Sequence, residues 1–164
     1  MAQFIIHPAA RLGHVNLKVA DMQHALAFYC DVLGFRIRRY RPGGQIAFLG
    51  AGESSFDLAL VALADPVESP PSANIPGLDH IAIRYPGRRD LARAYQHLLE
   101  CKVSLIEATD HRIAESLYFV DPDGNQVEIY WERPPEFWFA EDGQIRSQLK
   151  PLDLTNLLGA LREP

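Results

Sequence analysis

A chain of 164 residues, of which 48% are apolar and whose formal charge is −5 at pH 7, has the composition of one ordinary globular domain. Its acidic and basic residues are interspersed, and the sequence has no block of basic residues that could bind a phosphate backbone. Nucleic acid is therefore not expected as a partner. The N-terminus lacks a signal-peptide pattern, and no window approaches about 18 uninterrupted apolar residues. We therefore expect a soluble, cytoplasmic protein without a membrane partner.

The two cysteines, Cys30 and Cys101, lie in separate segments of helical pattern and form no C-x-x-C pair. A disulfide framework and a thiolate zinc site are therefore not expected. We expect both thiols to be small, buried core residues.

The chain repeats itself at a spacing of about 66 residues. In each half an alternating strand pattern leads into a helical pattern and then into three strand-like runs. In the first half these segments are 13–19, 21–35, 35–41, 45–50 and 56–63. In the second half they are 79–85, 88–103, 102–108, 116–120 and 126–131. Both halves therefore predict β-α-β-β-β, and the fold class is α+β, with the repeats forming a curved mixed sheet around a concave site.

We expect one domain over residues 1–164. It divides into repeat one at about 11–63, a linker at 64–77, repeat two at about 78–132 and a C-terminal tail at 133–164. The linker contains four prolines, which extend neither a helix nor a central strand. The tail is expected to pack aromatic residues on the core and to form one short helix capped near Asp153.

The predicted helices have recognisable ends. Asp21 is a good N-cap for the first helix, and Gly34 stops it. Asp90 is the candidate N-cap of the second helix.

His14 and His80 occupy equivalent positions of the two repeats. The apolar residues of GHVNLKV share one face of a strand, which leaves His14 on the other face, and the same alternation in DHIAIRY isolates His80. If helices cover the apolar faces, both imidazoles point to the concave side of the sheet. A single histidine is more often structural than functional, but two at matched positions favour a ligand.

Glu128 is a carboxylate inside a strand pattern. With DPDGN as a five-residue loop at 121–125, the hairpin register places Tyr118 directly opposite Glu128 on one face. A carboxylate there must be ion-paired, metal-bound or protonated. One interpretation is a salt bridge with Lys18 or Arg84. The other is a site of two neutral imidazoles and one carboxylate, the facial triad of non-haem iron.

These segments together resemble the vicinal oxygen chelate superfamily, which includes glyoxalase I, extradiol dioxygenases, fosfomycin-resistance transferases and bleomycin-binding proteins. HVNLKVADMQHALAFYCDVLGF, DHIAIRY and DPDGNQVEIYW carry the resemblance, over roughly residues 11–131. The segment DHRIAESLYFVDPDGNQVEIYWERPPEFW, followed by LKPLDLTNLL, is most similar to bacterial catechol-2,3-dioxygenase-like proteins. The resemblance implies a glyoxalase/bleomycin resistance/dihydroxybiphenyl dioxygenase fold.

The resemblance also implies a site. His14, His80 and Glu128 match the metal ligands, with Fe(II) expected first and Mn, Zn or Ni as alternatives. Tyr118 matches the tyrosine that contacts a substrate oxygen, and His111 matches the histidine that assists the oxygen chemistry. The competing interpretations are that Tyr118 is a core aromatic residue and that His111 is a solvated loop residue.

The implied function is an extradiol-type ring-cleaving dioxygenase of aromatic catabolism, acting with O2 on a small catechol-like aromatic as a homodimer or higher homo-oligomer.

Two residues depart from the pattern. Ala59 stands where glyoxalase I has a fourth ligand, and Phe56 stands where extradiol enzymes usually have an acid-base histidine. The alternatives are a non-catalytic bleomycin-resistance-like binding module, and a glyoxalase- or fosfomycin-type metal-dependent lyase or transferase.

Overall fold

The computed structural model describes residues 4–65 and 76–162. The expected linker at 64–77 lies for the most part outside these ranges. Within them, no helix has both the length and the apolar composition needed to cross a membrane.

The first repeat forms a four-stranded mixed sheet with the strand order β1-β4-β3-β2. The two strands of the edge pair, β1 and β4, run parallel, and the other pairs are antiparallel. The strands are β1 (Val15–Val19), β2 (Arg36–Tyr40), β3 (Ile46–Gly50) and β4 (Leu58–Ala62).

The second repeat forms a five-stranded mixed sheet with the order β5-β8-β7-β6-β9, so that the prediction of an α+β fold built from two repeats is confirmed. The expected curved sheet consists of two separately hydrogen-bonded sheets. The run expected at 102–108 becomes strand only from Glu107, because the chain first turns at Lys102, which has φ of 58°. The strands are β5 (His80–Tyr85), β6 (Glu107–Asp110), β7 (Ala114–Val120), β8 (Gln126–Glu132) and β9 (Lys150–Pro151).

The helices begin and end largely where the sequence predicts. Asp21 Oδ1 accepts the backbone N–H groups of Gln23 and His24 at 2.7 and 3.0 Å, and Gly34 has φ of 79° after the helix. The prediction for Asp90 is wrong, because Gly87 is the N-cap and Asp90 lies in the first turn. The helices are α1 (Met22–Leu26) with its π-helical continuation η1 (Ala27–Val32), α2 (Arg88–Glu100) and α3 (Leu154–Gly159), and the short 3-10 turns are η2 (Pro135–Phe137) and η3 (Ala160–Arg162).

The tail helix α3 confirms the predicted cap, since Asp153 Oδ1 accepts the N–H of Asn156 at 3.0 Å. The expectation for the cysteines is wrong for Cys101, which is exposed because it follows the last residue of α2. Cys30 is half-buried, and its burial raises the pKa of its thiol. Both cysteines are free.

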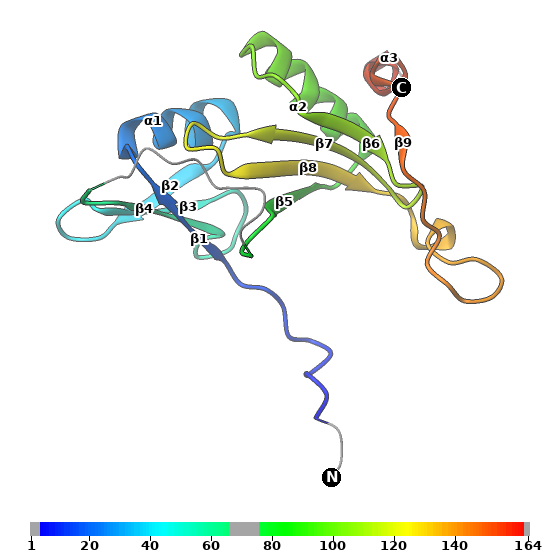
Figure 1. Cartoon of the computed structure of the whole chain (residues 1–164), viewed down its shortest axis with the longest axis horizontal. Helices are drawn as coiled ribbons and strands as arrows, with labels where there is room; N and C mark the ends of the chain where they lie inside the picture. The colour runs from blue at the N-terminus through cyan, green and yellow to red at the C-terminus, as the bar shows by residue number, and fades with distance from the viewer. Residues whose placement is uncertain (1–3, 66–75, 163–164) are drawn as a thin grey trace.

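Helices α1, α2 and α3 lie on one side of the sheets, and the opposite side is open (Figure 1). The apolar faces of the strands meet the helices in a common core, which includes Leu17 of β1 and Val127 and Ile129 of β8. The segment before β1 leaves the body of the molecule as an extended arm (Figure 1). The open side is therefore the side to which the polar faces of the strands turn.

A buried carboxylate joins the two repeats. Asp121, at the start of the DPDGN loop, accepts the N–H groups of Asp123 and Asn125 at 2.9 and 2.8 Å. It also accepts the hydroxyl of Tyr29 from η1 at 2.9 Å, and burial together with this carboxylate raises the pKa of Tyr29. Asp123 in turn accepts the N–H of Ala20 at 3.0 Å. The hairpin of the second repeat is thereby attached to the first helix.

We predict that Tyr29→Phe lowers the free energy of unfolding by about 1–2 kcal/mol, because Asp121 loses a buried hydrogen bond. Urea unfolding followed by circular dichroism measures the change. Tyr40→Phe, at an exposed tyrosine of β2, is the matched control and should change the free energy by less than about 0.5 kcal/mol. Equal stability of the two variants would contradict the proposed joint.

Candidate metal centre

Glu128 lies on the open face of β8, between two core residues. Val127 and Ile129 are buried on the helix side, and alternation turns Glu128 to the other face. In the hairpin, Tyr118 pairs with Glu128, which is the register that the five-residue loop predicts. Glu128 is only 9% exposed, so its carboxylate needs partners.

A histidine and a tyrosine satisfy this carboxylate. His80 Nε2 lies 3.1 Å from Glu128 Oε2, and the Tyr118 hydroxyl donates to Glu128 Oε1 at 2.9 Å. The salt-bridge interpretation is wrong for Arg84, which pairs with Glu132 at 2.9 Å. Among the described residues, Lys18 forms no ion pair with Glu128 either. The partners of the carboxylate are therefore an imidazole and a phenol.

The second nitrogen of His80 is held by Asp79. The His80 Nδ1 atom lies 2.7 Å from Asp79 Oδ2, an arrangement that directs Nε2 toward Glu128. Sequence reasoning missed this role of Asp79. Its signal was the adjacent pair Asp-His at the start of a strand.

His111 extends the cluster beyond Tyr118. Its Nε2 lies 3.0 Å from the Tyr118 hydroxyl. Because a tyrosine hydroxyl has one proton and Tyr118 gives it to Glu128, we assign a proton to His111 Nε2, which donates to the Tyr118 oxygen. Burial, the hydrogen bond to Glu128 and its charge raise the pKa of Tyr118 to about 12. Tyr118 is therefore a neutral hydrogen-bond donor at physiological pH.

His14 is not gathered into this cluster. It is exposed just before β1, and its ring centre lies 4.5 Å from that of Phe56. In the described residues, no three His, Cys, Asp or Glu side chains are placed to hold one metal ion. A cavity of about 320 Å³ is lined by Val15 and Ile81, which follow the two histidines and which alternation turns to the opposite face.

His80 and Glu128 pass a geometric test for metal binding. Two donors that each lie about 2.1 Å from an ion and meet at a right angle are about 3 Å apart. The measured separation of His80 Nε2 and Glu128 Oε2 is 3.1 Å. This distance is that of a hydrogen-bonded ion pair and equals the spacing of two donors on one ion, while His14 lies outside the arrangement.

The strand register places Ala59 at the equivalent of Glu128. In the first sheet Asn16 of β1 pairs with Ala59 of β4, and in the second Ala82 of β5 pairs with Glu128 of β8. A methyl group has no donor atom, so the first repeat contributes no carboxylate at this position.

Arginine side chains hold the turn that carries His111. Arg133 binds both oxygens of Asp110, at 2.7 and 3.3 Å, and donates to the Arg112 carbonyl at 2.9 Å. It also donates to buried Glu115 at 2.8 Å, which receives a second bond of 2.7 Å from Arg88. Sequence reasoning missed this network, which fixes the turn in place although Arg112 has φ of 70°.

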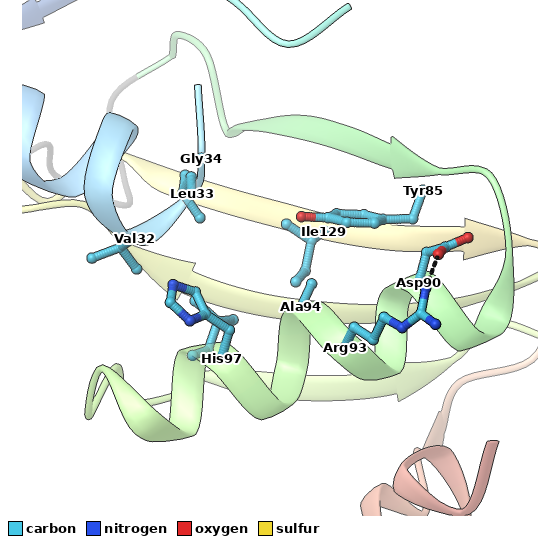
Figure 2. A pocket seen from close by; sticks show the side chains of 10 residues that line it. Val32, Leu33, Gly34, Tyr85, Asp90, Arg93, Ala94, His97 and Ile129 are labelled. Atoms are coloured by element: carbon cyan, nitrogen blue, oxygen red, sulfur yellow. Dashed lines mark hydrogen bonds and ion pairs between the residues drawn. The ribbon is translucent and has the colours of Figure 1, made fainter. Parts of the chain in front are cut away.

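A second cavity, of about 330 Å³, lies on the helix side of the sheet (Figure 2). Ile129 lines it, and because Ile129 follows Glu128 in β8, the cavity opens on the face opposite the carboxylate. Arg93 and His97 of α2 also line it, and Arg93 pairs with Asp90 at 3.3 Å (Figure 2). This cavity is therefore separate from the cluster around Glu128.

Comparison with known proteins identifies the family. The model of the glyoxalase/bleomycin resistance protein/dioxygenase superfamily matches residues 11–129. The chain belongs to this superfamily. It is 30% identical over 155 residues to a catechol-2,3-dioxygenase of Bacillus subtilis. The matched segment covers 93% of the chain and 53% of that protein. The chain thus spans about half the length of this relative.

Other superfamily members with different names are also similar. The metallothiol transferase FosB of Lysinibacillus sphaericus is 28% identical over 127 residues, covering 73% of the chain and 80% of that protein. A crystal structure of a glyoxalase/dioxygenase from Nostoc punctiforme superposes with a TM-score of 0.63 and 23% identity, covering 82% of the chain and all of that structure. The comparisons therefore support the fold and the superfamily. The similar proteins are named for more than one reaction.

We predict that Glu128→Gln lowers the pKa of Tyr118 in the metal-free protein, because the variant removes the negative charge that disfavours the phenolate. Burial still holds the pKa above that of an exposed tyrosine. Absorbance at 295 nm as a function of pH follows the titration, with Tyr118→Phe identifying the signal. An unchanged titration in Glu128→Gln would show that the two side chains are not in contact.

We also predict a pH-dependent effect of Asp110→Asn. Partial burial favours a higher pKa of Asp110, but the hydrogen bonds from Arg133 and from the Arg112 backbone outweigh it and hold the pKa below 3.8. A lowered pKa in the folded state stabilises the protein above about pH 4, and this contribution is lost as the pH falls through the folded value. Asp110→Asn should therefore cost about 1–3 kcal/mol at about pH 6 and less at about pH 3.

Urea unfolding at the two pH values measures this difference. Asp90→Asn, which removes an exposed pair within one helix turn, is the control and should cost less than about 0.5 kcal/mol at both. A cost for Asp110→Asn that stays the same at low pH would contradict the assignment of the pair with Arg133.

Proposed function

We propose that the protein is a metal-dependent extradiol-type dioxygenase that cleaves a small catechol-like aromatic with O2. The observation that carries this proposal is the separation of 3.1 Å between His80 Nε2 and Glu128 Oε2, with Tyr118 and His111 bonded in series to the same carboxylate. The similarity to a catechol-2,3-dioxygenase supports the same reaction.

His80, Glu128 and His14 are the proposed ligands of the metal. Fe(II) is the first candidate, and Mn, Zn and Ni bind the same donor types. His14 joins the set when its exposed imidazole turns away from Phe56. When bound, an ion with one carboxylate and two neutral imidazoles keeps residual positive charge and open positions for a diol and for oxygen.

Tyr118 and His111 are the proposed proton-carrying groups. Tyr118 has a pKa of about 12, so it keeps its proton and can donate it in a hydrogen bond to a substrate oxygen. His111 Nε2 holds a proton 3.0 Å from the Tyr118 oxygen and can support it in that role. Phe56 cannot accept a proton, and Tyr118 and His111 both hold protons in this arrangement, so water takes the proton that a bound diol releases.

A metal-dependent transferase is the second candidate. A set of two histidines and one glutamate is not specific for ring cleavage, and the similarity to a metallothiol transferase favours this reading. The four-ligand glyoxalase I site is disfavoured by Ala59. A non-catalytic binding module has no need of the His80, Glu128 and Tyr118 cluster.

We propose that the protein assembles as a homodimer or higher oligomer. The arm before β1 exposes Phe4, Ile5 and Ile6, with 91%, 78% and 71% of their surface accessible. Large apolar side chains gathered in this way are typical of contact surfaces.

Anaerobic purification followed by elemental analysis tests the metal site. We predict about one metal ion per chain in the wild type, and at least a tenfold loss of affinity in Glu128→Ala and in His80→Ala. Glu132→Ala is the matched control, since it removes a carboxylate from the same strand and face and should keep the metal. No metal in the wild type, or equal metal in Glu128→Ala, would refute the proposed site.

Oxygen uptake with catechol and with 2,3-dihydroxybiphenyl then tests the reaction. We expect uptake in the iron-loaded wild type and a loss of about 10²–10⁴-fold in kcat for Tyr118→Phe, because a positioned hydrogen-bond donor is removed. Metal binding without uptake on either compound would favour the transferase reading.

A further inference from the structure

The open face of the first sheet carries a cluster of arginines that the metal site does not use. A β-bulge between Ile37 and Arg39 inserts one extra residue, Arg38, into β2. As a result Arg39 pairs with Phe48, on the face opposite the buried side chain of Leu49. The bulge therefore turns Arg39 to the same face as Phe48.

Gly50 shows that this arrangement of β2 requires room. A Cβ atom at Gly50 would lie 2.6 Å from Arg38 Nε, so the side chain of Arg38 occupies the space that any larger residue would fill. Arg38 donates to the carbonyl of Gly52. One arginine is thus engaged by the backbone, which leaves Arg39 as the guanidinium turned toward the middle of the sheet.

Arg39 lies at one end of a continuous row of side chains, which we call the first-sheet wall. The wall consists of Arg39, Phe48, Phe56 and His14. The Arg39 guanidinium carbon lies 5.7 Å from the centre of the Phe48 ring. Phe48 meets Phe56 edge-to-face, with 5.0 Å between ring centres, and Phe56 lies 4.5 Å from the ring of His14. The wall therefore leads from the expected metal ligand of the first repeat to a cation.

Among the residues that the structure describes, no carboxylate pairs with Arg39. In the described ranges, Arg36, Arg39 and Arg41 are exposed, and none forms an ion pair with a carboxylate. Lys18 is exposed on the same face of β1. This positive surface belongs to a chain whose formal charge is −5, so it is local and not a property of the whole molecule.

We propose that the first-sheet wall binds an aromatic diol with an anionic substituent, the ring lying against Phe48 and Phe56 and a carboxylate pairing with Arg39. This inference rests on the proposed function, because it places the diol at the metal, with His14 turned from Phe56 toward the ion and with Phe48 and Phe56 left to contact the ring. A planar guanidinium offers a carboxylate two parallel hydrogen bonds, and its contact with Phe48 holds it in orientation. Phe56 thereby has a role in substrate recognition in place of the missing histidine.

The test compares two diols that differ in one charge, 3,4-dihydroxyphenylacetate and 4-methylcatechol. Their affinities are measured by calorimetry on the full chain loaded with Zn(II), which holds a diol but has no redox chemistry. We expect the anionic diol to bind about tenfold more tightly at low salt, as a charged hydrogen bond predicts. The preference should shrink as the ionic strength rises. Equal affinities at low salt would overturn the inference.

Variants separate specific recognition from general charge. Arg39→Gln should remove the preference, so that 3,4-dihydroxyphenylacetate and 4-methylcatechol bind with equal affinity. Arg36→Gln, with the same charge change on the same strand but outside the first-sheet wall, should keep the preference. Loss of the preference in both variants to the same extent would overturn the role of Arg39.

An NMR spectrum of the arginine side chains decides the inference independently of the metal. In metal-free protein, 3,4-dihydroxyphenylacetate should shift the Nε–H signal that is missing in Arg39→Gln, and 4-methylcatechol should not. If the wild type binds no metal, the proposed function fails while this spectrum still decides the inference. If the metal binds and the Arg39 signal does not move, the inference fails alone.

Discussion

The buried carboxylate of Glu128 is the constraint on which the arrangement of the second sheet depends. It lies on a strand whose other face packs on the core. A shift of the register of β8 by one residue would turn Glu128 into the core and expose its apolar neighbours. His80 and Tyr118 satisfy its two oxygens, and Asp79 and His111 satisfy these partners in turn. A series of five polar side chains therefore follows from one residue and one register.

The parts of this arrangement that sequence could predict are those set by local patterns. Alternation with period two and an odd loop length fix the pairing of Tyr118 with Glu128, and both are visible in the sequence SLYFVDPDGNQVEIYW. The caps at Asp21 and Asp153 depend on hydrogen bonds to backbone groups two or three residues away. Several residues near a helix start have the chemistry of a cap, so the local pattern predicts Asp90 where Gly87 takes the position.

The parts that could not be predicted depend on contacts between distant segments. Arg133 meets Asp110 across 23 positions of the chain, and nothing in either local pattern names the other as its partner. The position of His14 is of the same kind, since a strand pattern places its side chain on a face but does not decide whether the ring lies against Phe56 or beside His80. Sequence therefore predicts which face a group occupies better than which neighbour it touches.

Ala59 and Glu128 make the two repeats chemically unlike at one equivalent position. Two copies of the second half would place a carboxylate at both equivalent positions, and an ion held there would be neutralised and more fully enclosed. Two copies of the first half would offer no carboxylate at all. A chain with Ala59 in one repeat and Glu128 in the other is the combination that would leave a bound ion both charged and accessible.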